Sequence, residues 1–177
     1  MDIAICKALP ENANDYADCV ISCWQSAYKG IVSDEYLKNM LAEKKQRVEK
    51  YKSIFIAPGD CEYFCVMQSE RMIGFLIIQK NRDEFRIGEI WAIYLIEEFW
   101  GKGYGTKLLD FALAELKHAG KKNVFLWVFE ENKKARRFYE KHGFCFDGTK
   151  REVDKYGCIS LVQLRYSFNC LMRMVIK

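Results

Sequence analysis

The chain has 177 residues, of which 50% are hydrophobic and 15% aromatic, and its formal net charge is +4. This length and composition predict one globular domain, 1–177, with a substantial hydrophobic core, and they argue against a disordered chain. The small positive charge is spread over short basic pairs, which argues against a dedicated nucleic-acid-binding protein.

Two further classes are disfavoured by the distribution of apolar residues and cysteines. No apolar run reaches the roughly 20 residues of a membrane span, and the first residues lack the pattern of a secretory signal. The eight cysteines lie among apolar neighbours without a Cys-x-x-Cys pair, and there are two histidines. We therefore expect a cytoplasmic protein with free thiols, no metal site, and no membrane or nucleic-acid partner.

The amino-terminal third predicts a strand followed by a two-helix block. Residues 2–9 favour a strand that ends before Pro10. Over 14–28, apolar residues recur at steps of three and four, which predicts an amphipathic helix. Residues 33–35, Ser-Asp-Glu, are typical of a helix start, and the polar stretch 43–52 is expected to continue that helix as an arm.

The remaining elements predict a sheet interrupted by two more helices. Residues 63–67 and 72–78 read as two strands of a hairpin whose register the connecting loop does not determine. Further predicted strands cover 87–96, 124–129, 144–146 and 159–166, and helices are predicted from Tyr104 to about 118 and over 132–143. This order is typical of a mixed α/β sheet with helices packed on it.

A glycine-rich turn follows the strand 87–96. Gly101, Gly103 and Gly105 alternate at the start of a predicted helix. Such a turn lets several backbone N–H groups approach a phosphate, and the positive end of the helix and the charge of Lys102 would add to the attraction. The spacing fits neither a Walker loop nor the Gly-x-Gly-x-x-Gly dinucleotide fingerprint.

The segment from Asn132 to Phe144 is the second distinctive stretch. Asn132 is a good helix N-cap, Gly143 is a good helix stop, and Tyr139 lies on the face that also carries Phe138. An ordinary packed helix explains all of these features, so the spacing alone leaves a structural and a functional interpretation open.

Together the two stretches resemble the GNAT superfamily of acyl-CoA-dependent N-acyltransferases. The family turn Gln/Arg-x-x-Gly-x-Gly/Ala corresponds to residues 100–105, with Trp100 in place of Gln or Arg. The family motif Asn-x-x-Ala-x-x-Phe-Tyr-x-x-x-Gly-Phe runs without a gap from Asn132 to Phe144. The resemblance implies a mixed, mostly antiparallel, seven-stranded sheet flanked by about four helices.

The resemblance also implies a chemistry and a set of site residues. Acetyl-CoA would be the cosubstrate, and an amine would attack its thioester directly in a ternary complex, without a metal. Leu95 would polarise the thioester carbonyl through its amide, and Tyr139 would protonate the leaving thiolate. The residues expected to bind acetyl-CoA are Ile93, Tyr94, Leu95, Gly101, Lys102, Gly103, Tyr104, Gly105, Thr106, Asn132 and Tyr139. Glu89 is the expected base, with Glu97, Glu98 and His142 as competitors.

The acceptor site is expected in the two-helix block. Trp24, Tyr28 and Tyr36 lie in a pattern that resembles small bacterial family members, some of which acetylate polyamines. Aromatic faces there can hold an alkylammonium group, although packing in the core is by itself a sufficient explanation for Trp24 and Tyr28, which lie one turn apart. The sequence thus predicts an N-acetyltransferase of a small primary amine, with polyamines among the candidates. The alternatives are a protein or peptide N-acetyltransferase and a non-catalytic acetyl-CoA-binding module. A homodimer, with the apolar tail 170–176 at its interface, is compatible with the sequence.

Overall fold

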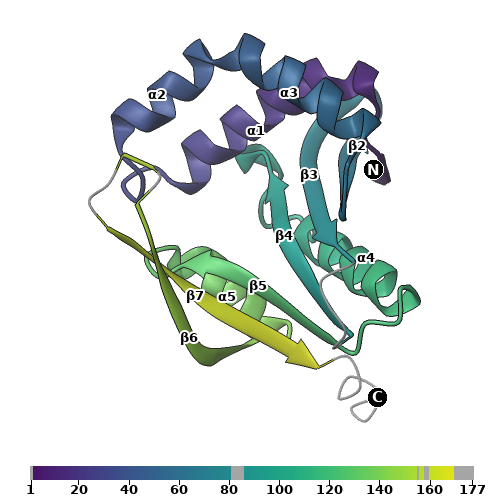
Figure 1. The fold of residues 1–177 in the computed structure, drawn as a ribbon, viewed down its shortest axis with the longest axis vertical. Helices are drawn as coiled ribbons and strands as arrows, with labels where there is room; N and C mark the ends of the chain where they lie inside the picture. The colour runs from purple at the N-terminus through teal and green to yellow at the C-terminus, as the bar shows by residue number, and fades with distance from the viewer. Residues whose placement is uncertain (1, 81–85, 155, 158–159, 170–177) are drawn as a thin grey trace.

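The computed structural model describes residues 2–80, 86–154, 156–157 and 160–169. Its strands and helices follow one another in nearly the predicted order (Figure 1). They are β1 (Ala4–Lys7), α1 (Ala13–Ala27), α2 (Asp34–Ala42), α3 (Lys44–Ile56), β2 (Cys61–Gln68), β3 (Arg71–Gln79), β4 (Ile87–Leu95), α4 (Tyr104–His118), β5 (Asn123–Phe129), α5 (Lys133–Lys141), β6 (Cys145–Val153) and β7 (Leu161–Asn169). Short 3-10 helices, η1 (Pro10–Asn12) and η2 (Glu97–Phe99), precede α1 and the glycine turn.

The strands form one seven-stranded sheet in the order β1-β2-β3-β4-β5-β7-β6. Every neighbouring pair is antiparallel except β4 and β5, which are parallel. The predicted mixed, mostly antiparallel, seven-stranded sheet is therefore confirmed.

The core lies on both faces of the sheet because successive strand residues point to opposite sides. On one face, Cys65 and Phe75 pack with residues of α1 and α2. On the other face, their neighbours Phe64 and Leu76 pack with Leu109 and other residues of α4. The hydrophobic runs of the central strands are continuous because both of their faces are covered.

The middle of the sheet opens between β4 and β5. Their parallel register ends at the pair Ile90 and Leu126, although β4 continues to Leu95 and β5 to Phe129. At the same point the β3–β4 register shifts, so that Ile77 faces Ala92 and Ile78 faces Ile90. This bulge at Trp91 bends β4, and the two strands diverge beyond it (Figure 1).

The helix count differs from the prediction. Residues 33–52 form two helices, α2 and α3, which meet at Glu43, so the sheet is flanked by five α-helices rather than about four. The chain turns at this point because α3 packs against α1: the rings of Tyr51 and Phe55 lie 4.9 and 5.0 Å from that of buried Tyr16. A long-range aromatic contact thus ends a helix that the local sequence would continue.

The length of β6 also differs from the prediction. The sequence predicts a strand over 144–146 only, whereas β6 extends from Cys145 to Val153 and is mostly exposed. It is an edge strand held by β7, so its polar residues face water and leave no hydrophobic alternation to detect. The predicted carboxy-terminal tail lies outside the described residues, and the homodimer remains a prediction.

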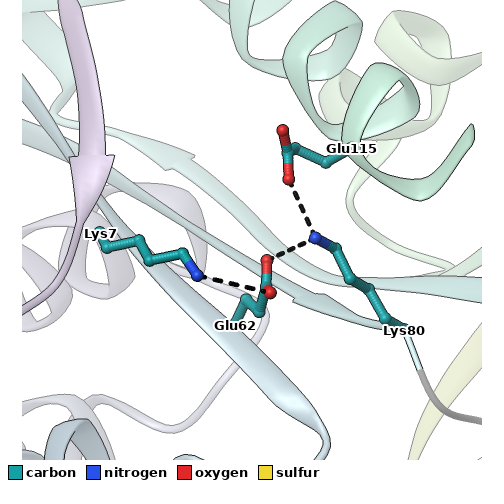
Figure 2. A network of polar contacts seen from close by, with 4 residues as sticks. All are labelled: Lys7, Glu62, Lys80 and Glu115. Carbon is teal, nitrogen blue, oxygen red and sulfur yellow. Dashed lines mark hydrogen bonds and ion pairs between the residues drawn. The ribbon is translucent and has the colours of Figure 1, made fainter. Parts of the chain in front are cut away.

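A chain of charges links the far edge of the sheet to α4. Figure 2 shows Glu62 between Lys7 and Lys80, at 3.6 and 2.7 Å, and Lys80 reaching Glu115 of α4 at 2.9 Å. Although burial opposes it, hydrogen bonds to Glu62 and Glu115 raise the pKa of Lys80. Among the described helices, none has the length and apolar character needed to cross a membrane.

Candidate active site

A cavity of about 480 Å³ lies where β4 and β5 separate. It extends through the sheet, because α1 on one face and α5 on the other both contribute to its wall. The lining residues are 26–28 at the end of α1 and just after it, 90–95 of β4, 100, 101, 103, 105 and 106 around the glycine turn, 127 and 128 of β5, and 132, 134, 135, 138, 139, 141 and 142 around α5.

The glycine turn presents unpaired backbone donors at the start of α4. Gly101 and Gly103 have left-handed backbone, with φ of +74° and +80°, and a Cβ at either would meet open space. Within the described residues, the N–H groups of 101, 102, 103, 105 and 106 donate no hydrogen bond. These amides and the positive end of α4 suit an anion such as the diphosphate of acetyl-CoA. The turn therefore fits the cosubstrate that the sequence predicts.

Trp100, the residue that departs from the family turn, is held by two contacts. Its indole Nε1 donates to the carbonyl of Leu95 at the end of β4, at 2.8 Å. The ammonium of Lys134, in the first turn of α5, lies 3.7 Å from the centre of its ring. Trp100 thus connects the end of β4 to α5 at the wall of the cavity.

Two of the predicted cosubstrate residues do not line the cavity. The ammonium of Lys102 lies 5.1 Å from the ring centre of Phe99, and the hydroxyl of Tyr104 accepts a hydrogen bond from Gln68. The other nine predicted cosubstrate residues do line it.

The second motif brings Asn132 and Tyr139 to the cavity. The Asn132 side chain caps α5 by accepting from the Ala135 amide at 3.1 Å. The Tyr139 hydroxyl makes no hydrogen bond with another described residue. Burial, followed by the proximity of Tyr28, raises the pKa of Tyr139, so the phenol is protonated at neutral pH. Tyr139 thus places a protonated phenol hydroxyl, without a hydrogen-bond partner among the described residues, in the cavity.

Two more tyrosines meet at the cavity wall. The hydroxyls of Tyr28, which follows α1, and Tyr94, on β4, hydrogen-bond to each other. Burial raises the pKa of Tyr28 to about 12 and that of Tyr94 well above its usual range. Both groups are therefore neutral donors and acceptors rather than bases.

Of the predicted acceptor residues, only Tyr28 lines the cavity. Trp24 and Tyr36 lie behind it and form an aromatic cluster with Tyr156, which belongs to the β6–β7 connection; the ring centres of this cluster are 5.3 to 6.1 Å apart. The Trp24 and Tyr28 rings are 4.8 Å apart. The cluster packs the amino-terminal helices against the β6–β7 connection.

The predicted bases differ in position. Glu89 is 4% exposed on β4 and is not among the lining residues, and the carboxylate of Glu98 pairs with Arg71. His142 does line the cavity. Its Nδ1 lies 2.7 Å from the Phe138 carbonyl and its Nε2 lies 3.0 Å from Thr106 Oγ1. Because a carbonyl only accepts, we infer that Nδ1 carries the proton.

Sequence reasoning missed several lining residues. Trp91 is 54% exposed although it lies in the middle of the sheet, and Trp127 faces the same opening from β5. Lys134 joins them from α5. The run 124–129 is apolar throughout, which would be unremarkable in a covered strand, so nothing in the sequence marks Trp127 as a cavity residue.

Comparison with known proteins adds a family to this geometry. The model of the Acetyltransferase (GNAT) family matches residues 24–144. The uncharacterized N-acetyltransferase MJ1207 of Methanocaldococcus jannaschii is 28% identical over 134 residues, which are 73% of this chain and 57% of that protein. A spermidine N(1)-acetyltransferase of Thermoplasma acidophilum is 25% identical over 151 residues, covering 84% of this chain and 92% of that one.

A solved structure has the same fold. The PaiA N-acetyltransferase of Thermoplasma acidophilum, crystallised in complex with coenzyme A, superposes with a TM-score of 0.74. The match covers 96% of this chain and 99% of the other at 22% sequence identity. The fold of this chain thus belongs to an architecture known from crystal structures.

Proposed function

Because the chain belongs to the acetyltransferase (GNAT) family, we propose that it transfers the acetyl group of acetyl-CoA to a primary amine of a small molecule. The observation that carries the proposal is Tyr139, a protonated phenol with a free hydroxyl in a cavity that crosses the sheet. The donor and the acceptor would meet at this phenol from opposite faces.

The donor side would be built from backbone. Acetyl-CoA supplies a thioester, whose carbonyl carbon is attacked by amines. The free amides of the glycine turn would bind its diphosphate. The edge of β4 that β5 leaves unpaired beyond Ile90 would pair with the pantetheine arm. The Leu95 amide would then stabilise negative charge on the thioester oxygen.

Tyr139 would act as the general acid. When the amine attacks and the carbon–sulfur bond breaks, the sulfur leaves as a thiolate that needs a proton. The Tyr139 hydroxyl can donate that proton because no described residue competes for it. The reaction needs no covalent enzyme intermediate, and none of the described cysteines lines the cavity.

The acceptor would enter on the α1 side, where residues 26–28 complete the cavity wall. The paired Tyr28 and Tyr94 hydroxyls would meet the incoming amine. Trp24 and Tyr36, one layer behind, would shape this end of the site through the aromatic cluster. Glu89 stays our proposed base. Since it is buried outside the cavity lining, it would take the amine's proton through water.

A polyamine is the acceptor that we propose to test first. Support comes from the relative named as a spermidine N(1)-acetyltransferase, at 25% identity, and from the aromatic residues near the acceptor end, since rings attract alkylammonium groups.

The test is release of the CoA thiol from acetyl-CoA with a panel of spermidine, spermine, monoamines, amino acids and short peptides. Thiol release with small amines, and mass spectrometry of the acetylated product, would support the proposal. Release with peptides alone would make the chain a peptide N-acetyltransferase. Tight binding of acetyl-CoA without any turnover would make it a binding module.

A further inference from the structure

Two lysines, Lys134 and Lys141, line the cavity, and Lys134, which the family motif does not specify, is the one that contacts Trp100 at the head of the glycine turn. Lys134 lies in the first turn of α5 and lines the cavity beside the glycine turn. Its ammonium is held 3.7 Å from the ring centre of Trp100. We propose that Lys134, positioned by Trp100, binds the diphosphate of acetyl-CoA in this protein. The inference rests on the proposed function, because it takes acetyl-CoA as the ligand of the cavity.

The glycine turn itself lacks a charge that faces the cavity. Trp100 stands where the family turn has Gln or Arg, so that position contributes no polar group to an anion from its ring face. The turn's own cation, Lys102, lies over Phe99 and does not line the cavity. Neither the head of the turn nor Lys102 therefore supplies a charge to the cavity.

The Trp100 ring is held in a fixed position by hydrogen bonds. Its indole N–H donates to the Leu95 carbonyl at 2.8 Å. The peptide that carries this carbonyl is also held on its other side, because Ile96 N–H donates to Ile73 at 2.9 Å. A ring fixed in this way presents one face to α5, and a lysine above such a face loses little freedom when it binds an anion.

Lys134 lies on the same cavity wall as the glycine turn with its free amides. Trp100, Gly101, Gly103 and Lys134 share the cavity wall. An anion on the turn amides would therefore have the ammonium beside it, and a charged donor strengthens hydrogen bonding to an anionic oxygen. In this protein the positive charge beside the diphosphate would thus come from α5, the neighbouring helix, and not from the head of the turn.

Trp100 also connects the Lys134 ammonium to the end of the site where the thioester would react. The same side chain touches Lys134 with its face and Leu95 with its N–H. Trp100 is therefore a positioning residue, which holds both the diphosphate partner and the end of β4 where the thioester would lie.

The test measures binding by isothermal titration calorimetry on the full chain. The ligands are CoA, dephospho-CoA, which keeps the diphosphate but lacks the 3′-phosphate, and acetyl-pantetheine, which lacks all phosphates. We expect Lys134→Gln to weaken CoA and dephospho-CoA by about 10-fold each, as removal of one charged hydrogen bond would. Acetyl-pantetheine affinity should not change. Lys134→Arg should keep most of the affinity.

The matched control is Lys133→Gln, which removes the neighbouring charge on α5 from a residue outside the cavity lining. It should change CoA affinity less than about 2-fold, because the Lys133 charge lies outside the cavity lining and reaches the diphosphate only through solvent. The double variant Lys134→Gln with Trp100→Arg returns a charge to the head of the turn and should recover part of the lost affinity. Circular dichroism of each variant checks that the fold is intact.

The outcomes separate the two levels of the proposal. Wild-type affinity for CoA in Lys134→Gln would overturn this inference and leave the proposed function standing. Loss of CoA affinity with unchanged dephospho-CoA affinity would also overturn it, since the lysine would then serve the 3′-phosphate. If the wild-type chain bound no CoA, the proposed function itself would fail.

Discussion

The hydroxyls of Tyr28 and Tyr94 hydrogen-bond to each other although 66 positions separate the two residues in the sequence. Tyr28 follows the last turn of α1 and Tyr94 lies on the part of β4 that β5 leaves unpaired. Their contact therefore fixes the amino-terminal helices to the unpaired part of β4, at the end of the cavity where the acceptor is proposed to enter.

Removing one of these two hydroxyls should lower the free energy of unfolding by more than half of what removing both lowers it. In Tyr28→Phe or Tyr94→Phe, the remaining buried hydroxyl loses its partner, which costs about 1–3 kcal/mol of folding free energy. The double variant removes both groups, so its cost should be clearly less than the sum of the single costs. Urea unfolding of the three variants measures this. Additivity within about 0.5 kcal/mol would show that the hydroxyls do not depend on each other.

Tyr139→Phe should slow catalysis without weakening cosubstrate binding. The change removes the proton donor for the leaving thiolate and keeps the ring, so kcat should fall about 10²- to 10⁴-fold. The Kd of acetyl-CoA should stay within about 2-fold, because the proposed contacts of the diphosphate are elsewhere. Steady-state kinetics and calorimetry give the two values. Tyr51→Phe on α3 is the control, and it should leave kcat unchanged. A kcat for Tyr139→Phe close to that of the wild type would exclude the acid role.

Gly157→Ala should disturb the acceptor end of the site. A Cβ at this position would lie 2.5 Å from Ser33 Oγ, which caps α2 and also donates to the Tyr156 carbonyl. Losing such a cap costs about 1 kcal/mol. The β6–β7 connection should move away from α2, and the acceptor KM should rise.

Gly148→Ala is the matched control for this prediction. Gly148 has the same left-handed backbone, with φ of +89° against +67° for Gly157, but a Cβ there meets open space. Both variants carry the strain of the left-handed conformation, and only Gly157→Ala carries the collision. Equal unfolding free energies and equal acceptor KM values would mean that the Ser33 contact has no effect.

Asp147→Asn should make the stability of the protein depend less on pH in the acid range. Although burial opposes it, hydrogen bonds from Ser167, Thr149 and Arg165 lower the pKa of Asp147 from 3.8 to about 2. A carboxylate with a lowered pKa stabilises the folded chain above its unfolded value of 3.8. That contribution is lost as the pH falls toward 2.

The measurement is the urea midpoint of wild type and Asp147→Asn at several pH values. The wild type should be more stable at pH 7, and the difference should shrink as the pH falls from about 4 to about 2. Asp154→Asn, which removes an exposed carboxylate just after β6, is the control for the loss of one negative charge. A difference that stays constant down to pH 2 would mean that the Asp147 carboxylate does not titrate with folding.

Local features of the sequence predicted the glycine turn and the cap of α5, and both are present in the structure. The alternation of glycines at 101, 103 and 105 requires a particular backbone, and Asn132 caps the helix that it precedes. Both depend on near neighbours in the chain, which a single sequence contains. The family resemblance then gave these features a common ligand, and the family match agrees with it.

The rest of the site depends on where distant elements meet. Trp91 and Trp127 line the cavity only because β4 and β5 separate, and that separation follows from a bulge that no single strand sequence reveals. Lys102 faces Phe99 and Lys134 faces Trp100, a choice made by ring positions in the folded chain. Orientation of flexible side chains is therefore the part that a motif cannot supply.

The short parallel register between β4 and β5 has a mechanical consequence. Among the described residues, four pairs, from Ile87 with Asn123 to Ile90 with Leu126, join the two halves of the sheet by strand pairing. A pantetheine arm lying along the free edge of β4 would act as a strut across that narrow seam. Bound acetyl-CoA would then hold the two halves of the sheet together, so that ligand binding and the stability of the whole domain would increase and decrease together.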